Sequence, residues 1–249
     1  MVQIHGFWMG RNLQAKEIAS IKSFVDLGYT YNLWSYDNNL KLPHGCVFQN
    51  ANEIIDKKIL ELWLSDNDKP IFFCQTFANF FRYNLLYNTG GWWADLDIYL
   101  LKKLPEDDYV FTSIHDIDTR QELNELNLPK KGGNIANGFF KVPSRCDLLK
   151  DIVENVNIQG EKGIYPKKFG EWGTILFTKK IFSKNLQCYK VPLIGNGYED
   201  RVKIYEEKKF ELPKWTYALH WYNFSNPFSK IDRQSYFYDL VLKGYVKIL

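Results

Sequence analysis

The alternation of apolar and polar positions predicts a strand, a helix and a second strand at the start of the chain. Residues 2–9 alternate loosely, which is typical of a strand. Residues 15–25 carry apolar side chains at helical spacing, Asn12 offers a helix cap, and Gly28 can take the left-handed conformation that ends a helix. Residues 29–37 are rich in strand-forming side chains. A strand–helix–strand unit of this kind builds parallel sheets.

Similar patterns continue along the chain. They predict a short strand at 46–49 and helices at 52–64, 74–88, 146–156 and 174–183. Residues 107–143 predict further strands, separated by a polar stretch at 115–134 that we interpret as a lid. Because no Pro-, Gly- or Ser-rich stretch divides the sequence, we expect residues 1–249 to form a single α/β domain.

The stretch 92–104 is interpreted as one strand that carries two carboxylates on one face. Its even positions, such as Leu96 and Ile98, are apolar, whereas Asp95 and Asp97 share the opposite parity. A partly buried pair of carboxylates is costly unless it is neutralised, and Mn²⁺ or Mg²⁺ is its natural partner, together with substrate phosphates. The alternative is an exposed strand face with two solvated aspartates.

The helix predicted before this strand offers polar side chains to the same place. Asn79 and Arg82 are three residues apart and share a helix face, and a turn at Gly90 and Gly91 would bring that face over the two aspartates. A guanidinium group binds phosphate in a bidentate manner or orients sugar hydroxyls. The alternative is that Arg82 simply forms an ion pair with one of the aspartates.

Composition narrows the class of partner. The chain of 249 residues has 32 Lys and Arg against 29 Asp and Glu, a net charge of +3, and only six of its cations are Arg. Nucleic-acid surfaces concentrate positive charge and use Arg to read bases. We therefore expect no nucleic-acid partner, whereas an anionic substrate or membrane surface is compatible with this charge.

The cysteines and the apolar stretches indicate a reducing compartment. Cys46, Cys74, Cys146 and Cys188 lie far apart without zinc-site spacing, and we expect reduced, packed thiols. The sequence has no signal-peptide pattern and no apolar stretch long enough to cross a bilayer. We therefore expect a cytoplasmic protein, whose basic and aromatic stretch at 230–249 could touch the inner face of a membrane.

The stretch 77–104 resembles the DxD region of glycosyltransferase family 32 and its relatives, the capsular-polysaccharide transferases and the large clostridial glucosylating toxins. The shared pattern is a helix with an arginine, a glycine pair, an aromatic residue, and Asp-x-Asp beginning thirteen residues after the arginine, as Arg82 and Asp95 are spaced here. This resemblance implies a GT-A fold with a mainly parallel central sheet flanked by helices. Residues 1–104 would form the nucleotide-sugar part, and residues 105–249 the acceptor and metal-completing part.

The resemblance also implies roles for single residues. Trp8 would stack on the nucleobase, Asn137 would contact the sugar, and Trp172 would mark the acceptor side. The implied metal ligands are Asp95, Asp97 and His220. The implied catalytic residues are Asp95, Asp97, Arg82 and Asn137, and the implied donor-binding residues are Trp8, Asn79, Arg82, Trp93, Asp95 and Ser225. We interpret His5, His44 and His115 as structural.

Three positions depart from the family pattern. Asn79 stands where family members commonly have Asp, so the donor sugar is open. Thr174 replaces the usual proline of the acceptor turn. Asn226 replaces the tryptophan that often follows the terminal serine, which leaves one diphosphate contact open.

The hypothesis is a glycosyltransferase that uses Mn²⁺ or Mg²⁺ and a nucleoside-diphosphate sugar, with UDP favoured over GDP. The acceptor would be a glycan or lipid-linked glycan, as in polysaccharide biosynthesis, and the resemblance implies retention of anomeric configuration. One alternative is a glycoside hydrolase in which Asp95 and Asp97 act as acid and base. Another is a non-catalytic module that binds a nucleotide sugar or a glycan.

Overall fold

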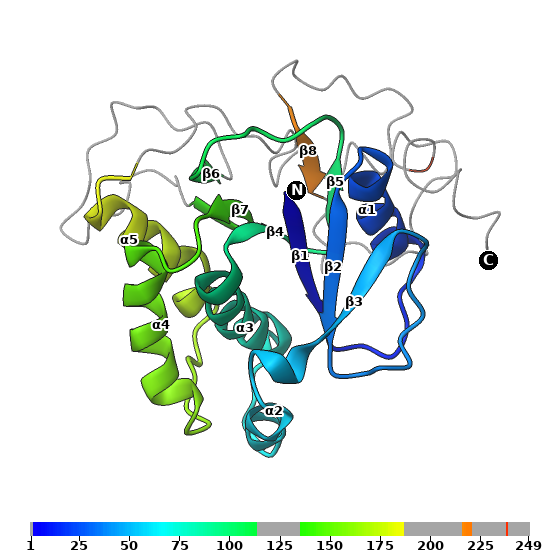
Figure 1. Ribbon diagram of the computed structural model, residues 1–249. Helices are drawn as coiled ribbons and strands as arrows, with labels where there is room; N and C mark the ends of the chain where they lie inside the picture. The colour runs from blue at the N-terminus through cyan, green and yellow to red at the C-terminus, as the bar shows by residue number, and fades with distance from the viewer. Residues whose placement is uncertain (1, 114–134, 187–215, 221–237, 239–249) are drawn as a thin grey trace.

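A six-stranded sheet forms the centre of the molecule (Figure 1). The computed structural model describes residues 2–113, 135–186, 216–220 and 238. The sheet order β3-β2-β1-β4-β7-β6 is built from β1 (Gln3–Trp8), β2 (Thr30–Ser35), β3 (Cys46–Asn50), β4 (Gly91–Ala94), β6 (Val110–Ser113) and β7 (Ile135–Val142). β1 to β4 are mutually parallel, whereas β7 runs antiparallel to β4 and β6. The predicted α/β class with a mainly parallel sheet is confirmed.

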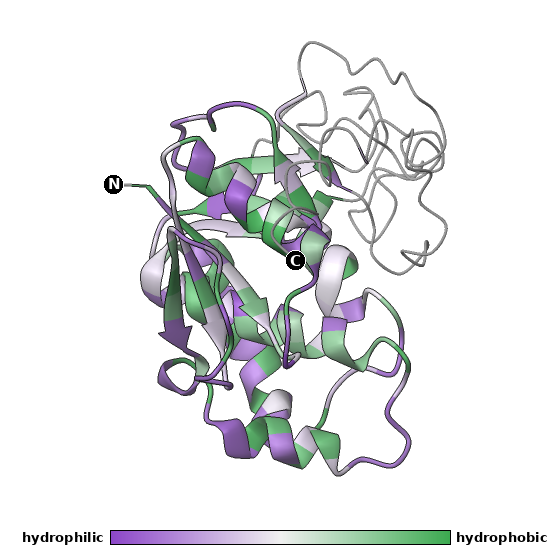
Figure 2. Ribbon diagram, turned by 90° about the vertical axis from the view of Figure 1, so that its right-hand side faces the viewer, coloured by the Kyte–Doolittle hydropathy of each residue, from purple (hydrophilic) through white to green (hydrophobic). Residues whose placement is uncertain are grey.

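Helices cover both faces of this sheet. They are α1 (Ala15–Asp26), α2 (Lys57–Leu64), α3 (Phe73–Thr89), α4 (Asp147–Gly160) and α5 (Leu176–Ser183), with a 3₁₀ turn at Ala51–Glu53 and a π-helical turn at Glu171–Ile175. α1 lies on one side of the sheet, and α3, α4 and α5 lie on the other (Figure 1). Two buried apolar clusters result, one on each face. Most helix ribbons carry both apolar and polar residues in Figure 2, as expected where one helix face packs on a core.

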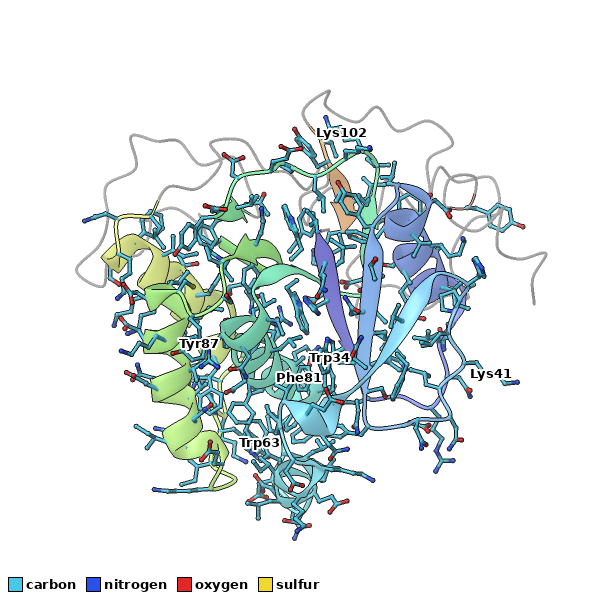
Figure 3. The ribbon with its side chains drawn as sticks, viewed as in Figure 1. Trp34, Lys41, Trp63, Phe81, Tyr87 and Lys102 are labelled. Atoms are coloured by element: carbon cyan, nitrogen blue, oxygen red, sulfur yellow. The ribbon has the colours of Figure 1, made fainter. Side chains whose placement is uncertain are left out.

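The larger cluster includes the apolar side chains of α3, and half of its buried residues are aromatic. Phe81 of α3 packs beside Trp34 of β2, with ring centroids 6.2 Å apart (Figure 3). Trp63 of α2 stacks on Tyr165 at 4.3 Å and donates a hydrogen bond from Nε1 to the carbonyl of Gly160 at 2.7 Å. These contacts join α3 to β2, and α2 to the end of α4 and the connection that follows it.

Most predicted elements are present, with differences at their ends. Gly28 ends the α1 region with φ 86°, as predicted. The cap of α1 is Gln14 rather than Asn12, because Glu17 accepts a hydrogen bond from the Gln14 backbone and closes a capping box. The helix predicted at 52–64 is divided, because the Asp56 side chain accepts from the Lys58 backbone and starts a new helix, α2.

The stretch 92–104 is not one strand, which corrects the sequence interpretation. β4 ends at Ala94, the carbonyl of Asp95 accepts a hydrogen bond from the Ile98 backbone at 3.0 Å, and the chain turns. It continues as β5 (Ile98–Leu100), which pairs antiparallel with β8 (Ala218–His220) in a separate two-stranded sheet. The two aspartates therefore lie in a turn between two sheets and not on one strand face.

Two further expectations concern the thiols and the membrane. Cys46, Cys74 and Cys146 are free, but Cys74 is exposed, so the prediction that all are packed is wrong for this residue; Cys188 lies outside the described residues. The predicted lid at 115–134 also lies outside them. In the ranges that the structure describes, none of the helices combines the length and the apolar character needed to cross a membrane.

The buried His5 in β1 is expected to make the folded protein less stable in acid. It is 2% exposed, its Nδ1 accepts a hydrogen bond from Trp34 Nε1 at 3.1 Å, and burial lowers its pKa from 6.5 to about 4. Between these values the unfolded chain binds the proton more readily, so stability falls as pH falls. We expect the free energy of unfolding to drop by about 3 kcal/mol between pH 7 and pH 4 through this residue.

Denaturant unfolding at several pH values measures this effect. His5→Gln keeps an acceptor for Trp34 but does not titrate, so its unfolding free energy should decline less over this range. His44→Gln, at an exposed position, is the matched control and should decline as the wild type does. Equal pH profiles for the wild type and His5→Gln would contradict the prediction.

Candidate functional site

A cleft of about 470 Å³ opens where the parallel strands β1 and β4 end. The end of β1 and the loop after it contribute Phe7, Trp8, Met9 and Gly10, and the turn after β4 contributes Asp95, Leu96 and Asp97. The carboxyl ends of neighbouring parallel strands meet at one edge of a sheet, which is where open α/β sheets bind ligands. Trp8 and both predicted aspartates are therefore brought together in a cleft of the size that binds small molecules.

Two helices form the walls of this cleft. The start of α1 contributes Gln14, Lys16 and Glu17, and α3 contributes Cys74, Gln75, Ala78 and Arg82. Apart from Arg82, sequence reasoning missed all of these. A signal was present, because Gln75, Ala78 and Arg82 have the spacing of a single helix face. The Oε1 atom of Gln75 is buried without a hydrogen-bond partner among the described residues.

Asp95 is held by three groups of the protein. Its Oδ1 lies 3.1 Å from Arg82 Nη2 and accepts a hydrogen bond from Trp93 Nε1 at 2.7 Å, and its backbone N–H donates to the carbonyl of Gly138 at 2.8 Å. Burial raises the pKa of Asp95, the charge of Arg82 opposes this, and the charge of Asp97 adds to it. Trp93 is 1% exposed and positions this carboxylate from behind the cleft.

Arg82 is directed mainly at protein groups. It is 4% exposed, its guanidinium lies 4.8 Å from the Trp93 ring centroid, and it donates hydrogen bonds to the carbonyls of Ala78, at 3.3 Å, and Asn137. Of the two sequence interpretations of Arg82, the ion pair with Asp95 is therefore what the structure shows.

Asp97 and His220 meet across the small second sheet. His220 is the register partner of Ile98 in the β5–β8 pair, which places its Nε2 3.2 Å from Asp97 Oδ2. Within the described ranges, no three His, Cys, Asp or Glu side chains are grouped closely enough to hold a metal ion. The donor set nevertheless suits a divalent cation, since it combines two carboxylates two residues apart with an imidazole beside one of them. Ser225 lies outside the described residues.

The two predicted sugar contacts bind each other. Asn137 Nδ2 donates to Asn79 Oδ1 at 2.7 Å, and neither residue is among those that line the cleft. A Cβ atom at Gly173 would lie 3.0 Å from Asn79 Nδ2, so this glycine allows the 170–175 turn to approach the pair. Trp172 is 8% exposed and packs against the aromatic cluster, at 5.9 Å from Trp63.

Residues 14–118 match the family model described as "Glycosyltransferase sugar-binding region containing DXD motif". This part of the chain is therefore similar to a DXD sugar-binding region. The resemblance to DxD glycosyltransferases is thereby confirmed, and Asp95 and Asp97, the pair that the sequence analysis assigns to the motif, lie within the matched residues. The matched residues include both walls of the cleft, α1 and α3.

Solved glycosyltransferase structures show a distant likeness. A PaToxG glycosyltransferase is 16% identical with a TM-score of 0.41, over 74% of this chain and 68% of its own. The galactosyltransferase LgtC, in complex with donor and acceptor sugar analogs, is 10% identical with a TM-score of 0.41, over 75% and 72%. The bifunctional glycosyltransferase WbbM is 12% identical with a TM-score of 0.47, over 97% of this chain but 50% of its own. No curated protein matches the sequence significantly.

Gly138 provides a test of how the DXD region positions its first aspartate. A Cβ atom at Gly138 would lie 2.5 Å from Asp95 Oδ2, so Gly138→Ala must displace this carboxylate. A displacement of about 1 Å at a reacting centre can cost about a hundredfold in rate, and we expect a loss of about ten- to a hundredfold in sugar transfer. The measurement is kcat with the best donor.

Gly160→Ala is the matched control for this prediction. Its Cβ atom would meet Phe80 at 2.7 Å in the core, away from the cleft. It should lower the melting temperature while the folded enzyme keeps its activity. If Gly138→Ala kept the wild-type rate, the positioning role of this glycine would be contradicted.

Proposed function

We propose that this protein transfers a sugar from a nucleoside-diphosphate sugar, with UDP favoured over GDP, to a glycan or lipid-linked glycan. The observation that carries the proposal is the meeting of Trp8, Arg82 and the two DXD aspartates in one cleft of a DXD sugar-binding region. The family supports a nucleotide-sugar donor and a glycan acceptor. The proposal includes retention of the anomeric configuration, Mn²⁺ or Mg²⁺ as the ion, and a lipid-linked glycan as one form of the acceptor.

In this proposal each part of the cleft has a chemical role. Trp8 offers an aromatic face on which a nucleobase can stack. Asp95, Asp97 and His220 would hold Mn²⁺ or Mg²⁺, which would neutralise negative charge on the departing diphosphate. The charge of Arg82 opposes the burial that raises the pKa of Asp95, and its 3.1 Å contact holds this carboxylate in place. Asn79 and Asn137, as a hydrogen-bonded pair next to Gly173, would orient the sugar.

A donor screen tests the proposal. The protein is incubated with UDP- and GDP-sugars and Mn²⁺, and release of the nucleoside diphosphate is measured, followed by an NMR time course of the anomer formed. We expect release from a UDP-sugar that EDTA abolishes and Mn²⁺ restores. Activity that survives EDTA would favour the hydrolase alternative, and inversion at the anomeric carbon would overturn the retaining assignment.

One observation favours a second candidate, a binding module without catalysis. Asn79 replaces the carboxylate expected from the family resemblance, and its amide is bound to Asn137 rather than lining the cleft. Such a module would bind UDP or GDP in the presence of Mn²⁺ without releasing diphosphate from any donor sugar. Calorimetry beside the donor screen separates the two candidates.

Cytoplasmic location and contact with an anionic membrane also stay predictions. The stretch 230–249 on which the membrane contact rests lies outside the described residues except Tyr238. Sedimentation with vesicles that contain anionic lipid at low salt would test the contact, and absence of binding would remove it.

A further inference from the structure

Lys16 occupies a place that local structure disfavours. It is the second residue of α1, its side chain is 15% exposed, and it lines the cleft. The first turn of a helix carries partial positive charge, so a cation there is unfavourable. Burying most of a lysine side chain also restricts its rotamers and its hydration. Helix formation therefore does not account for a lysine at this position.

The neighbouring carboxylate binds Lys16 only weakly. Lys16 Nζ lies 4.0 Å from Glu17 Oε1, which is the outer limit of an ion pair, and the described part of the chain gives it no closer ionic partner. The other oxygen, Oε2, accepts the backbone N–H of Gln14 at 2.9 Å in the capping box. Glu17 is 2% exposed, so this carboxylate is fixed at the start of α1. The ammonium group therefore keeps hydrogen-bonding capacity for a ligand.

The second cation that lines the cleft is already engaged. Arg82 forms an ion pair with Asp95 at 3.1 Å and donates to the carbonyl of Asn137. Of the cations among the cleft-lining residues, Lys16 is the one without a close anionic partner. An anion that enters the cleft would therefore meet Lys16 on the α1 wall, opposite the wall formed by α3.

We propose that Lys16 binds the phosphate groups of the nucleotide donor, an inference that rests on the proposed function. A lysine binds phosphate as a compact positive charge with three N–H donors. The positive end of α1, which disfavours Lys16 in the free protein, favours the same anion. The diphosphate thus binds Lys16 on one wall of the cleft and lies near the DXD turn on the other side.

Calorimetry with a series of ligands tests this assignment. UDP, UMP and uridine are titrated into the wild type and into Lys16→Gln in the presence of Mn²⁺, and GDP, GMP and guanosine are used if GDP is the stronger ligand. Loss of one charged hydrogen bond should weaken the diphosphate about tenfold. The affinity for the nucleoside should not change, because it carries no phosphate. Lys16→Arg should keep most of the affinity for the diphosphate.

Lys22→Gln is the matched control on the same helix, since Lys22 forms a surface ion pair with Asp26 at 2.8 Å. It should bind UDP as the wild type does. Unchanged UDP binding by Lys16→Gln overturns the proposal, and so does an equal loss for UDP and uridine, which would show a structural role. If the wild type binds neither UDP nor GDP, the proposed function fails and this inference fails with it.

Discussion

Asp97→Asn is expected to lower the rate of sugar transfer at least about a thousandfold, which corresponds to about 4 kcal/mol of lost transition-state stabilisation. The amide has nearly the size of the carboxylate but carries no negative charge. It would therefore weaken cation binding in the DXD turn and replace one carboxylate oxygen beside His220, which lies 3.2 Å from Asp97 Oδ2. The measurements are kcat with the best donor and, separately, the affinity for Mn²⁺ by calorimetry.

Asp151→Asn is the matched control, because Asp151 pairs with Lys184 at 2.8 Å on the surface of α4 and α5. It should keep wild-type transfer and Mn²⁺ affinity. The role assigned to Asp97 would be contradicted by a variant that keeps activity within tenfold of the wild type, or by unchanged Mn²⁺ affinity. Circular dichroism and melting temperature establish that the Asp97 variant is folded.

The second large effect is expected at Arg82. Arg82→Met leaves the partly buried Asp95, whose side chain is 31% exposed, without its ionic partner. Loss of one member of a fully buried pair costs about 3–5 kcal/mol, so for this pair we expect a smaller loss of about 1–3 kcal/mol in the free energy of unfolding. It also removes the donor to the carbonyl of Asn137 and the contact with the Trp93 ring. Urea unfolding at pH 7.5 measures the loss. The double variant Arg82→Met with Asp95→Asn should recover part of it, because no buried charge is left.

The pH dependence of the Arg82→Met variant gives an independent check. Burial raises the pKa of Asp95 above its ordinary value of 3.8, and the charge of Arg82 opposes that rise. Without Arg82 the folded-state pKa rises further, so the unfolded chain releases its proton first as pH increases. The deficit relative to the wild type should therefore be small below the ordinary pKa and grow as pH rises through the folded-state pKa. A deficit independent of pH would contradict this account.

The parts of the fold that sequence predicted are those where a local period reports burial. α1 shows the apolar stripe of a helix with one buried face, and β1 and β2, which precede and follow it, show strand-forming residues. α3 is predominantly apolar and is buried on all sides from Asn79 to Leu86. The glycines that end these helices have conformations that other residues rarely adopt, as Gly28 and Gly90 show with positive φ. These signals come from residues that are close together in the sequence. They can therefore be recognised without knowing which distant helix or strand packs against them.

The stretch 92–104 shows why other parts of the fold could not be predicted from local sequence patterns. Apolar and polar residues do alternate in this stretch. However, β4 pairs with β1 and β7, whereas β5 pairs with β8, more than a hundred residues later in the chain. Where one strand ends and the next begins is decided by these distant partners. A local pattern contains no information about them.

The functional site also combines features that the sequence predicted with features that only the tertiary structure shows. The amino-acid sequence by itself predicted the kind of chemistry, because Arg82, the glycine pair, Asp95 and Asp97 form the pattern that resembles DxD glycosyltransferases. Only the tertiary structure decided that Arg82 binds Asp95, that Asn79 binds Asn137, and that Lys16 lines the cleft. The physical reason is that hydrogen bonds and ion pairs form between atoms a few ångströms apart. Which side chains come that close depends on which strands and helices end at the same edge of the sheet.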